Sequence, residues 1–143
     1  MTSIFDFLTQ DHRQCDDSYA AAEENVAAGR WDEATQSWTV FRTALDTHLS
    51  REEDILFPAF ETQTGNTQGP TSVMRMEHEQ MRSLVSEMDE AIVAKDTESF
   101  LGLAETLMIL NQQHNMKEEQ ILYPMSDQVL SDPDMLIKQM QEK

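Results

Sequence analysis

The sequence predicts an all-α fold: an antiparallel four-helix bundle that runs up, down, up and down and ends in a short additional helix. Apolar residues recur at helical spacing, and no segment shows the sustained alternation of a β-strand. Glycine and proline number only four each in 143 residues, so long regular elements are expected. The phrase at 48–58 also returns as a near-copy at 114–124, which indicates a tandem duplication of one helical hairpin.

The first hairpin is predicted from residues 4–28 and 31–62, with a turn at Gly29 between them. Pro58 should kink the last turns of the second helix, because proline has no backbone N–H to donate. The segment 65–70 holds two glycines and one proline and is the clearest loop. It separates the two hairpins.

The second hairpin is predicted from residues 71–94 and 97–127, with a turn at Lys95-Asp96 and Pro124 in the place of Pro58. Ser131-Asp132-Pro133 then forms a helix start, with a capping side chain before a proline in the first turn. We therefore expect one domain over residues 1–143, with the bundle at about 3–127 and a C-terminal extension at 128–143.

The composition excludes several classes of function. A formal net charge of −17 disfavours binding to nucleic acid and to anionic membranes. The longest apolar runs are far too short to span a bilayer. Cys15 is the single cysteine, so no disulfide forms within the chain, and the first residues lack the features of a secretory signal. These observations favour a cytoplasmic protein.

The four histidines follow a regular pattern. His12 and His48 are 36 residues apart, as are His78 and His114, and their midpoints fall at the two predicted hairpin turns. Residues at equal distance from a turn face each other in an antiparallel hairpin. The two pairs also repeat at an offset of 66 residues (78 − 12 and 114 − 48), so we expect all four at one level of the bundle.

Two glutamates join this pattern, because each lies four residues after a histidine and so on the same helix face. A metal-free core would leave these carboxylates buried and unpaired, at a cost of several kcal/mol each. The alternative, that each histidine is an ordinary hydrogen-bonded core residue, does not explain their common height. Nitrogen and hard oxygen donors without thiolate suit iron or manganese, with zinc as a further candidate. The predicted ligands are His12, His48, Glu52, His78, His114 and Glu118.

The motifs Asp11-His12 and Glu77-His78, with the phrases at 48–58 and 114–124, resemble the hemerythrin-like HHE cation-binding domain over about residues 3–127. The resemblance implies a four-helix bundle around a non-heme di-iron centre. It further implies two iron ions (Fe2+/Fe3+) with oxo or hydroxo bridges, held by the six residues above with Glu52 and Glu118 bridging. Zinc and manganese are the less favoured metals.

The chain departs from oxygen-carrying hemerythrins, which have a fifth histidine one helical turn from the ligand at position 78. The candidate positions hold Met74 and Arg82, and Glu118 fits the ligand pattern better than Glu119. The four-histidine, two-glutamate set resembles the branch that includes di-iron proteins of iron–sulfur cluster repair and nitric-oxide stress, and sensing domains. This resemblance favours reaction with O2, NO or peroxide over oxygen carriage.

Other residues are secondary candidates. Cys15, Tyr19 and Glu77 are candidates for the surroundings of the metal; the alternatives are a small buried filler for Cys15 and a surface acid for Glu77. Glu53 and Glu119 can reach ligating imidazoles, but a solvated role is expected for both. The remaining candidates are expected to pack in the core: Phe57, Tyr123, Met74, Met81, Met108 and Met116.

Three functions remain open at this stage. The first is a di-iron protein of redox stress response or sensing that acts on O2, NO or peroxide. The second is a carrier of O2 or iron without turnover. The third is a structural or regulatory bundle stabilised by metal. The extra C-terminal helix is compatible with a homodimer, and nothing in the sequence points to an electron donor.

Overall fold

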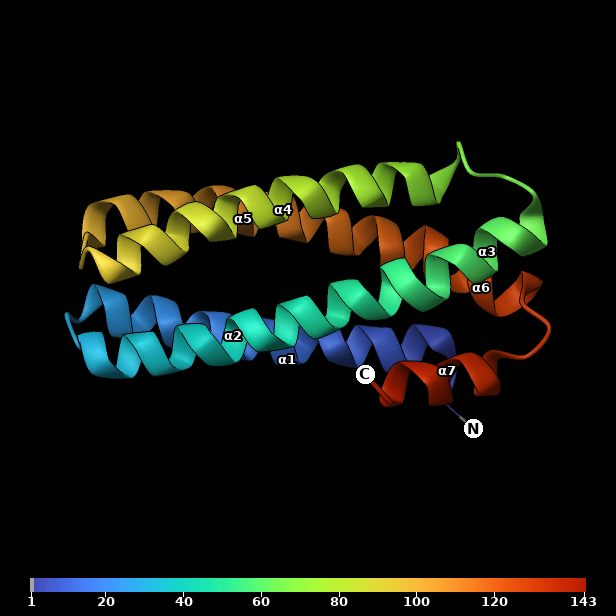
Figure 1. The fold of residues 1–143 in the computed structure, drawn as a ribbon, viewed down its shortest axis with the longest axis horizontal. Helices are drawn as coiled ribbons and strands as arrows, with labels where there is room; N and C mark the ends of the chain where they lie inside the picture. The colour runs from blue at the N-terminus through green and yellow to red at the C-terminus, as the bar shows by residue number, and fades with distance from the viewer. Residues whose placement is uncertain (1) are drawn as a thin grey trace.

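The computed structural model describes residues 2–143, which form a helical bundle with no β-strand in that range. The prediction of an all-α bundle is therefore confirmed. Figure 1 shows the long helices lying along a common axis, with the short last helix beside the half of the bundle away from the hairpin turns. None of the helices between residues 2 and 143 is long and apolar enough to cross a membrane.

The first hairpin consists of α1 (Ile4–Ala27) and α2 (Trp31–Arg51). The side chain of Ser3 caps α1 by accepting a hydrogen bond from the backbone N–H of Asp6 at 3.0 Å. Gly29 makes the turn with φ at 73°, a left-handed conformation that costs glycine little because it has no Cβ. The turn therefore forms where the sequence predicts it.

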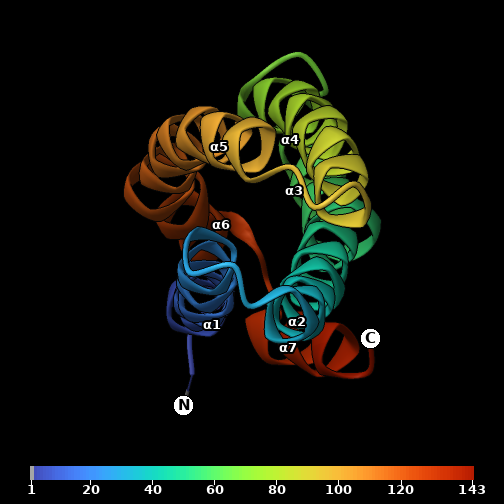
Figure 2. The same cartoon turned by 90° about the vertical axis from the view of Figure 1, so that its left-hand side faces the viewer.

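The second hairpin consists of α4 (Pro70–Val93) and α5 (Thr97–Lys117). The side chain of Asp96 caps α5 by accepting a hydrogen bond from the backbone N–H of Ser99 at 3.1 Å. Lys95 adopts a positive φ of 54°, the position that Gly29 fills in the first hairpin. Figure 2 shows the four helices at the corners of the bundle, with both hairpin turns at the same end.

The second helix of each hairpin is not the single kinked helix that the sequence suggests. A π-helical segment, η1 (Glu52–Leu56), follows α2 and leads into α3 (Phe57–Thr64). Likewise η2 (Glu118–Leu122) follows α5 and leads into α6 (Tyr123–Val129). Each proline lacks an N–H, so the hydrogen-bond pattern changes just before it. The wider π turn accommodates the missing hydrogen bond, so the chain continues as α3 to residue 64 and as α6 to residue 129.

Two apolar clusters build the core, one toward the hairpin turns and the other toward the open end. The first includes Trp38, Phe41 and Phe100, and the second includes Phe60 and Leu122. Along each long helix, the histidines fall between the two clusters. Apolar packing on both sides therefore keeps bulk water away from the polar layer.

The C-terminal helix α7 (Pro133–Gln141) forms as predicted and packs on the side of the bundle, against α1 and η1. The side chain of Asp132 caps it by accepting from the backbone N–H of Met135 at 3.1 Å. Ile137 and Met140 are buried in the second apolar cluster. Arg51 also donates from Nε to the carbonyl oxygen of Met140 at 2.8 Å, which fastens α7 to the helix that carries His48.

Candidate metal centre

The four histidines meet at one level of the bundle in two facing pairs. The ring centroids of His12 and His48 are 4.6 Å apart, and those of His78 and His114 are 4.9 Å apart. All four side chains are buried, with at most 4% of their surface exposed. The hairpin geometry therefore brings together the residues that the spacing of 36 predicts.

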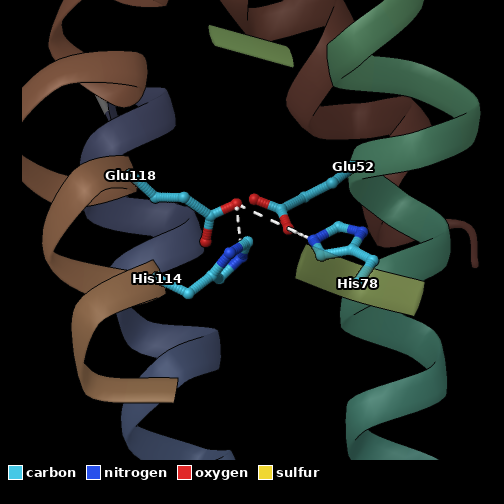
Figure 3. A group of neighbouring side chains, drawn as sticks. All are labelled: Glu52, His78, His114 and Glu118. Atoms are coloured by element: carbon cyan, nitrogen blue, oxygen red, sulfur yellow. Dashed lines mark ion pairs between the residues drawn. The ribbon is translucent and has the colours of Figure 1, made fainter. Parts of the chain in front are cut away.

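Glu52 and Glu118 lie between the two pairs and are fully buried. Oε1 of Glu52 is 3.3 Å from Nε2 of His48 and 3.2 Å from Nε2 of His78. Figure 3 shows this carboxylate opposite Glu118, with His78 and His114 directed toward them. Each of the two glutamates is the first residue of a π segment, so the widened turns occur where the carboxylates enter the site.

Glu118 presents one oxygen to each histidine pair. Its Oε1 lies 3.0 Å from Nε2 of His12, and its Oε2 lies 3.2 Å from Nε2 of His114. Two groups of ligand atoms each fall within 4.8 Å of one another, and both groups include Glu118. One group consists of Glu52, His78, His114 and Glu118, and the other of His12, His48 and Glu118.

Most of the inward atoms of this cluster have no hydrogen-bond partner. Six buried side-chain atoms lack a partner in the described chain, and five of them belong to the cluster: Nε2 of His48, His78 and His114, Oε1 of Glu52 and Oε2 of Glu118. A buried polar atom without a partner costs about 1–3 kcal/mol, and more when it is charged. Cations shared between these atoms would satisfy all five, so the residues present fit a metal site.

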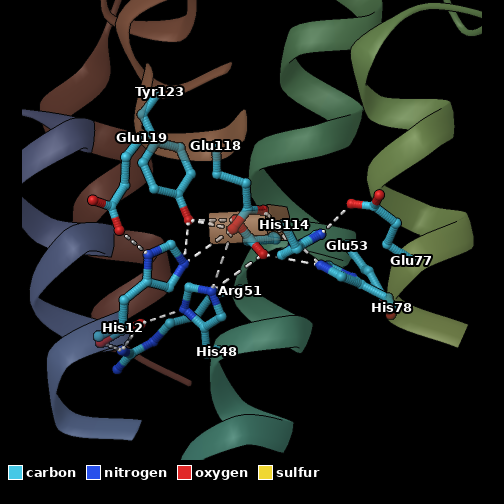
Figure 4. Close-up of polar contacts among 12 residues, drawn as sticks. His12, His48, Arg51, Glu53, Glu77, His78, His114, Glu118, Glu119 and Tyr123 are labelled. Atoms are coloured by element: carbon cyan, nitrogen blue, oxygen red, sulfur yellow. Dashed lines mark hydrogen bonds and ion pairs between the residues drawn. The ribbon is translucent and has the colours of Figure 1, made fainter. Parts of the chain in front are cut away.

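The outward nitrogen of each histidine contacts a carboxylate. Nδ1 of His12 lies 2.7 Å from Glu119, and Nδ1 of His78 lies 2.7 Å from Glu53. The expectation that these two glutamates are solvated is therefore wrong. Asp11 lies 3.2 Å from Nδ1 of His48. Glu77 lies 2.8 Å from Nδ1 of His114 (Figure 4). We call Glu53, Glu119, Asp11 and Glu77 the outer carboxylates.

The outer carboxylates fix the ring orientation of the histidines, so that each Nε2 points into the cluster. Sequence reasoning missed Asp11, although the repeat contained the signal: Asp11 and Glu77 both precede a histidine. Glu53 and Glu119 likewise both follow an inner glutamate. The duplication therefore extends from the six inner residues to the four carboxylates around them.

The family model for the hemerythrin HHE cation-binding domain matches residues 3–126. The chain belongs to this family. No curated protein and no solved structure matches it significantly. The family match covers the bundle and ends before α7, so the C-terminal helix is an addition to the hemerythrin domain of this chain.

Three of the four outer carboxylates in this hemerythrin domain are paired with cations. Arg51 contacts Asp11 at 2.7 Å, Arg82 contacts Glu53 at 2.8 Å, and Lys117 contacts Glu77. The fourth, Glu119, makes no ion pair with lysine or arginine in the part of the chain that the structure describes. Three carboxylates thus have their charge neutralised, and one does not.

The carboxylates also set the protonation of the metal-free cluster. Burial alone would lower the pKa of His78, but Glu52 and Glu53 raise it to about 9. Burial likewise opposes the charge of His48, yet Glu52 and Asp11 raise its pKa well above the usual value. Burial would raise the pKa of Glu53, but its hydrogen bonds with His78 and Arg82 lower it to about 2. Without metal, protons therefore take the place of cations in the hemerythrin site.

Tyr123 has a role that sequence reasoning missed. It is buried, as predicted, but its hydroxyl donates to Oε2 of Glu52 at 2.7 Å and lies 3.0 Å from Oε1 of Glu118. The equivalent residue in the first repeat, Phe57, has no hydroxyl and stacks on His78 with ring centroids 5.4 Å apart. The two halves of the site therefore differ in hydrogen bonding.

The other secondary candidates differ in whether they lie near the cluster. Cys15 is buried and adjoins His12 and His48 in a small cavity, and burial raises the pKa of its thiol to about 11. The hydroxyl of Tyr19 instead donates to the carbonyl oxygen of Ala104, so it does not face the cluster. Met108 and Met116 are exposed, so the expectation that they pack in the core is wrong.

Positions 74 and 82, where a fifth histidine would stand, hold methionine and arginine in this hemerythrin domain. Met74 is buried in the apolar cluster at the open end, beside residues such as Phe60. Arg82 is occupied by ion pairs with Glu53 and Glu79. Met81 is buried as expected and lines the small cavity beside His114.

Proposed function

We propose that the chain is a non-heme di-iron protein that binds or reacts with O2, NO or peroxide, in redox stress response or sensing. One observation carries the proposal: five buried, unpartnered donor atoms from Glu52, Glu118 and three histidines converge in one layer. The proposed ligands are His12, His48, Glu52, His78, His114 and Glu118.

The arrangement of donor atoms supports two ions rather than one. His12 and His48 would hold one ion, and His78 and His114 would hold the other. Glu118 directs a different oxygen toward each pair, and Glu52 lies within 3.3 Å of a histidine from each. Both carboxylates are therefore suited to bridge the two ions.

The donor set favours iron. Imidazole nitrogen and carboxylate oxygen without thiolate suit iron, manganese or zinc, and the family to which the chain belongs binds cations. When bound, iron supplies one-electron redox chemistry and an open coordination position, which the side chains of the site lack.

The protein itself orients the ligands, excludes water and supplies a hydrogen-bond donor. Burial and the neighbouring Glu118 and Glu52 raise the pKa of Tyr123 well above its ordinary value, so its hydroxyl stays protonated and keeps donating to the carboxylates. The outer carboxylates hold each imidazole in one orientation.

The space beside the cluster favours small reactants. The cavity among His12, His48 and His114 has a volume of about 10 Å³, which is about the room that one water molecule needs. Leu45 and Leu49 form part of its wall. A space of this size favours a reactant of a few atoms over an organic substrate.

Metal analysis combined with optical spectroscopy tests the proposal. We expect about two iron ions per chain, and an absorption change when the reduced protein meets O2, NO or peroxide. Consumption of NO or disproportionation of peroxide would support an enzyme, whereas stable, reversible oxygenation would support a carrier. Full occupancy by zinc with no iron would refute the redox function and leave a metal-stabilised structural bundle.

A further inference from the structure

Three of the differences between the two repeats lie on one face of the bundle. Residues 66 apart are equivalent, and most residues of the site keep their chemistry, as Arg51 and Lys117 do. Among the exceptions are Asp16 in place of Arg82, Asn111 in place of Leu45, and Asn115 in place of Leu49. All three lie on α1 or α5 and make that face more acidic or more polar.

The first difference removes a cation from beside the site. In one repeat, Arg82 contacts Glu53 through two nitrogens, each 2.8 Å from a carboxylate oxygen. In the other repeat, Asp16 stands at the position of Arg82. Among the described residues, the equivalent carboxylate, Glu119, makes its side-chain hydrogen bond and ion pair with His12. Partial burial raises the pKa of Asp16. The charge of His12 opposes this shift in pKa, and the charges of Glu119 and Asp17 add to it, so Asp16 and Glu119 interact.

These two acids line a groove between α1 and α5. The groove has a volume of about 530 Å³, and Glu23 adds a third carboxylate to its wall. No lysine or arginine lines it. Asn111 and Asn115 form part of its wall, so the groove combines carboxylates and amide groups with apolar side chains such as Phe41 and Leu107.

The amide side chains lie between the groove and the buried cluster of histidines and glutamates. Asn111 and Asn115 also line the small cavity that His48 and His114 border. The Nε2 atoms of these histidines have no hydrogen-bond partner, and their side chains are at least 97% buried. One pair of amide side chains therefore separates an acidic surface groove from unpartnered, metal-binding nitrogens.

A second groove reaches the same cavity but has different chemistry. It lies between α1 and α2, has a volume of about 410 Å³ and meets the cavity at Cys15. Its acid, Asp11, is paired with Arg51 at 2.7 Å, and the rest of its wall is mainly threonine and aliphatic side chains. This route offers a cation no uncompensated negative charge.

We propose that the groove between α1 and α5 is the entry route and transient binding site for a divalent metal cation on its way to the buried cluster. The proposal rests on the proposed metal-binding function. Asp16, Glu119 and Glu23 attract the cation and replace part of its water shell. The amide oxygens of Asn111 and Asn115 then pass it to the imidazoles, since hard divalent cations accept oxygen ligands of this kind.

Stopped-flow uptake of Co2+ by the metal-free protein tests the route, with the cobalt absorption bands as the signal. Asp16→Arg restores the residue type of the other repeat and should slow uptake by about tenfold at low salt, because focused charge raises on-rates by 10–10³-fold. The difference should shrink at high salt. Asp17→Arg is the matched control, since it makes the same charge change at an exposed neighbour outside the groove. Ala20→Trp, which fills the groove without changing charge, should slow uptake at both salt concentrations.

Equilibrium cobalt content, measured on the same samples, separates the route from the function. Slow uptake in Asp16→Arg with full final occupancy and a nearly normal rate in Asp17→Arg supports the route. Equal rates in the wild type, Asp16→Arg and Ala20→Trp, or equal slowing in the two arginine variants, overturns the route but leaves the metal centre intact. Failure of the wild type to bind cobalt at equilibrium overturns both proposals.

Discussion

The hydroxyl of Tyr123 donates a hydrogen bond to Glu52 across the bundle, with 2.7 Å between the two oxygens. The same hydroxyl lies 3.0 Å from Glu118. It therefore joins the two inner carboxylates, which come from different repeats. Because the equivalent residue is Phe57, this link exists on only one side of the site.

Replacing Tyr123 by phenylalanine should destabilise the metal-free protein by about 1–3 kcal/mol, since two buried carboxylates lose a donor. Metal content should be retained, whereas the optical spectrum of the loaded site should shift. Urea unfolding and spectroscopy measure these effects. Tyr19→Phe is the control, because it also removes a buried hydroxyl, but that hydroxyl donates to the carbonyl oxygen of Ala104 and not to a carboxylate of the site. A spectral shift of equal size in both variants would contradict a specific role for Tyr123.

Replacing His114 by alanine should remove about one metal ion per chain and leave the helices in place. The helices remain because the two apolar clusters, rather than the histidines, supply most of the packing. Elemental analysis and circular dichroism measure the two outcomes. Gln113→Ala, at the exposed neighbouring position, should keep both ions. Full metal content in the His114 variant would refute its assignment as a ligand.

Replacing Glu53 by glutamine should weaken metal binding by about 10–100-fold, because the charge that orients and polarises His78 is lost. Glu79→Gln is the matched control: Glu79 also contacts Arg82, but it is exposed and makes no contact with a histidine among the described interactions. Competition with a chelator of known affinity measures both variants. Equal affinities would show that the contact between Glu53 and His78 does not tune the site.

The metal-free protein should lose stability as the pH rises from about 6.5 to about 9. Burial opposes the charge on His78, but Glu52 and Glu53 raise its pKa from 6.5 to about 9. A folded-state pKa above the unfolded value contributes stability that is complete below pH 6.5 and is lost as the pH passes through 9. Urea unfolding with a chelator present measures this trend, which should be weaker in His78→Gln. Greater stability at pH 9 than at pH 6.5 would contradict it.

Much of the fold could be predicted because its causes are local. The four long helices follow from apolar spacing, and the first turn follows from Gly29, which readily adopts a positive φ. The π segments could not be predicted in this way. Pro58 signals only that hydrogen bonding must change nearby, whereas packing against the other helices decides that a π turn at Glu52–Leu56 absorbs the change.

The sequence by itself determined which residues form the inner cluster, because equal spacing from two turns fixes the height of His12, His48, His78 and His114. Only the tertiary structure decided the surroundings. Whether Glu119 is solvated or contacts His12, and whether the hydroxyl of Tyr123 faces the site, depends on how separate helices pack and rotate against each other. Helical periodicity sets the face on which a residue lies, but contacts between distant segments set what that face meets.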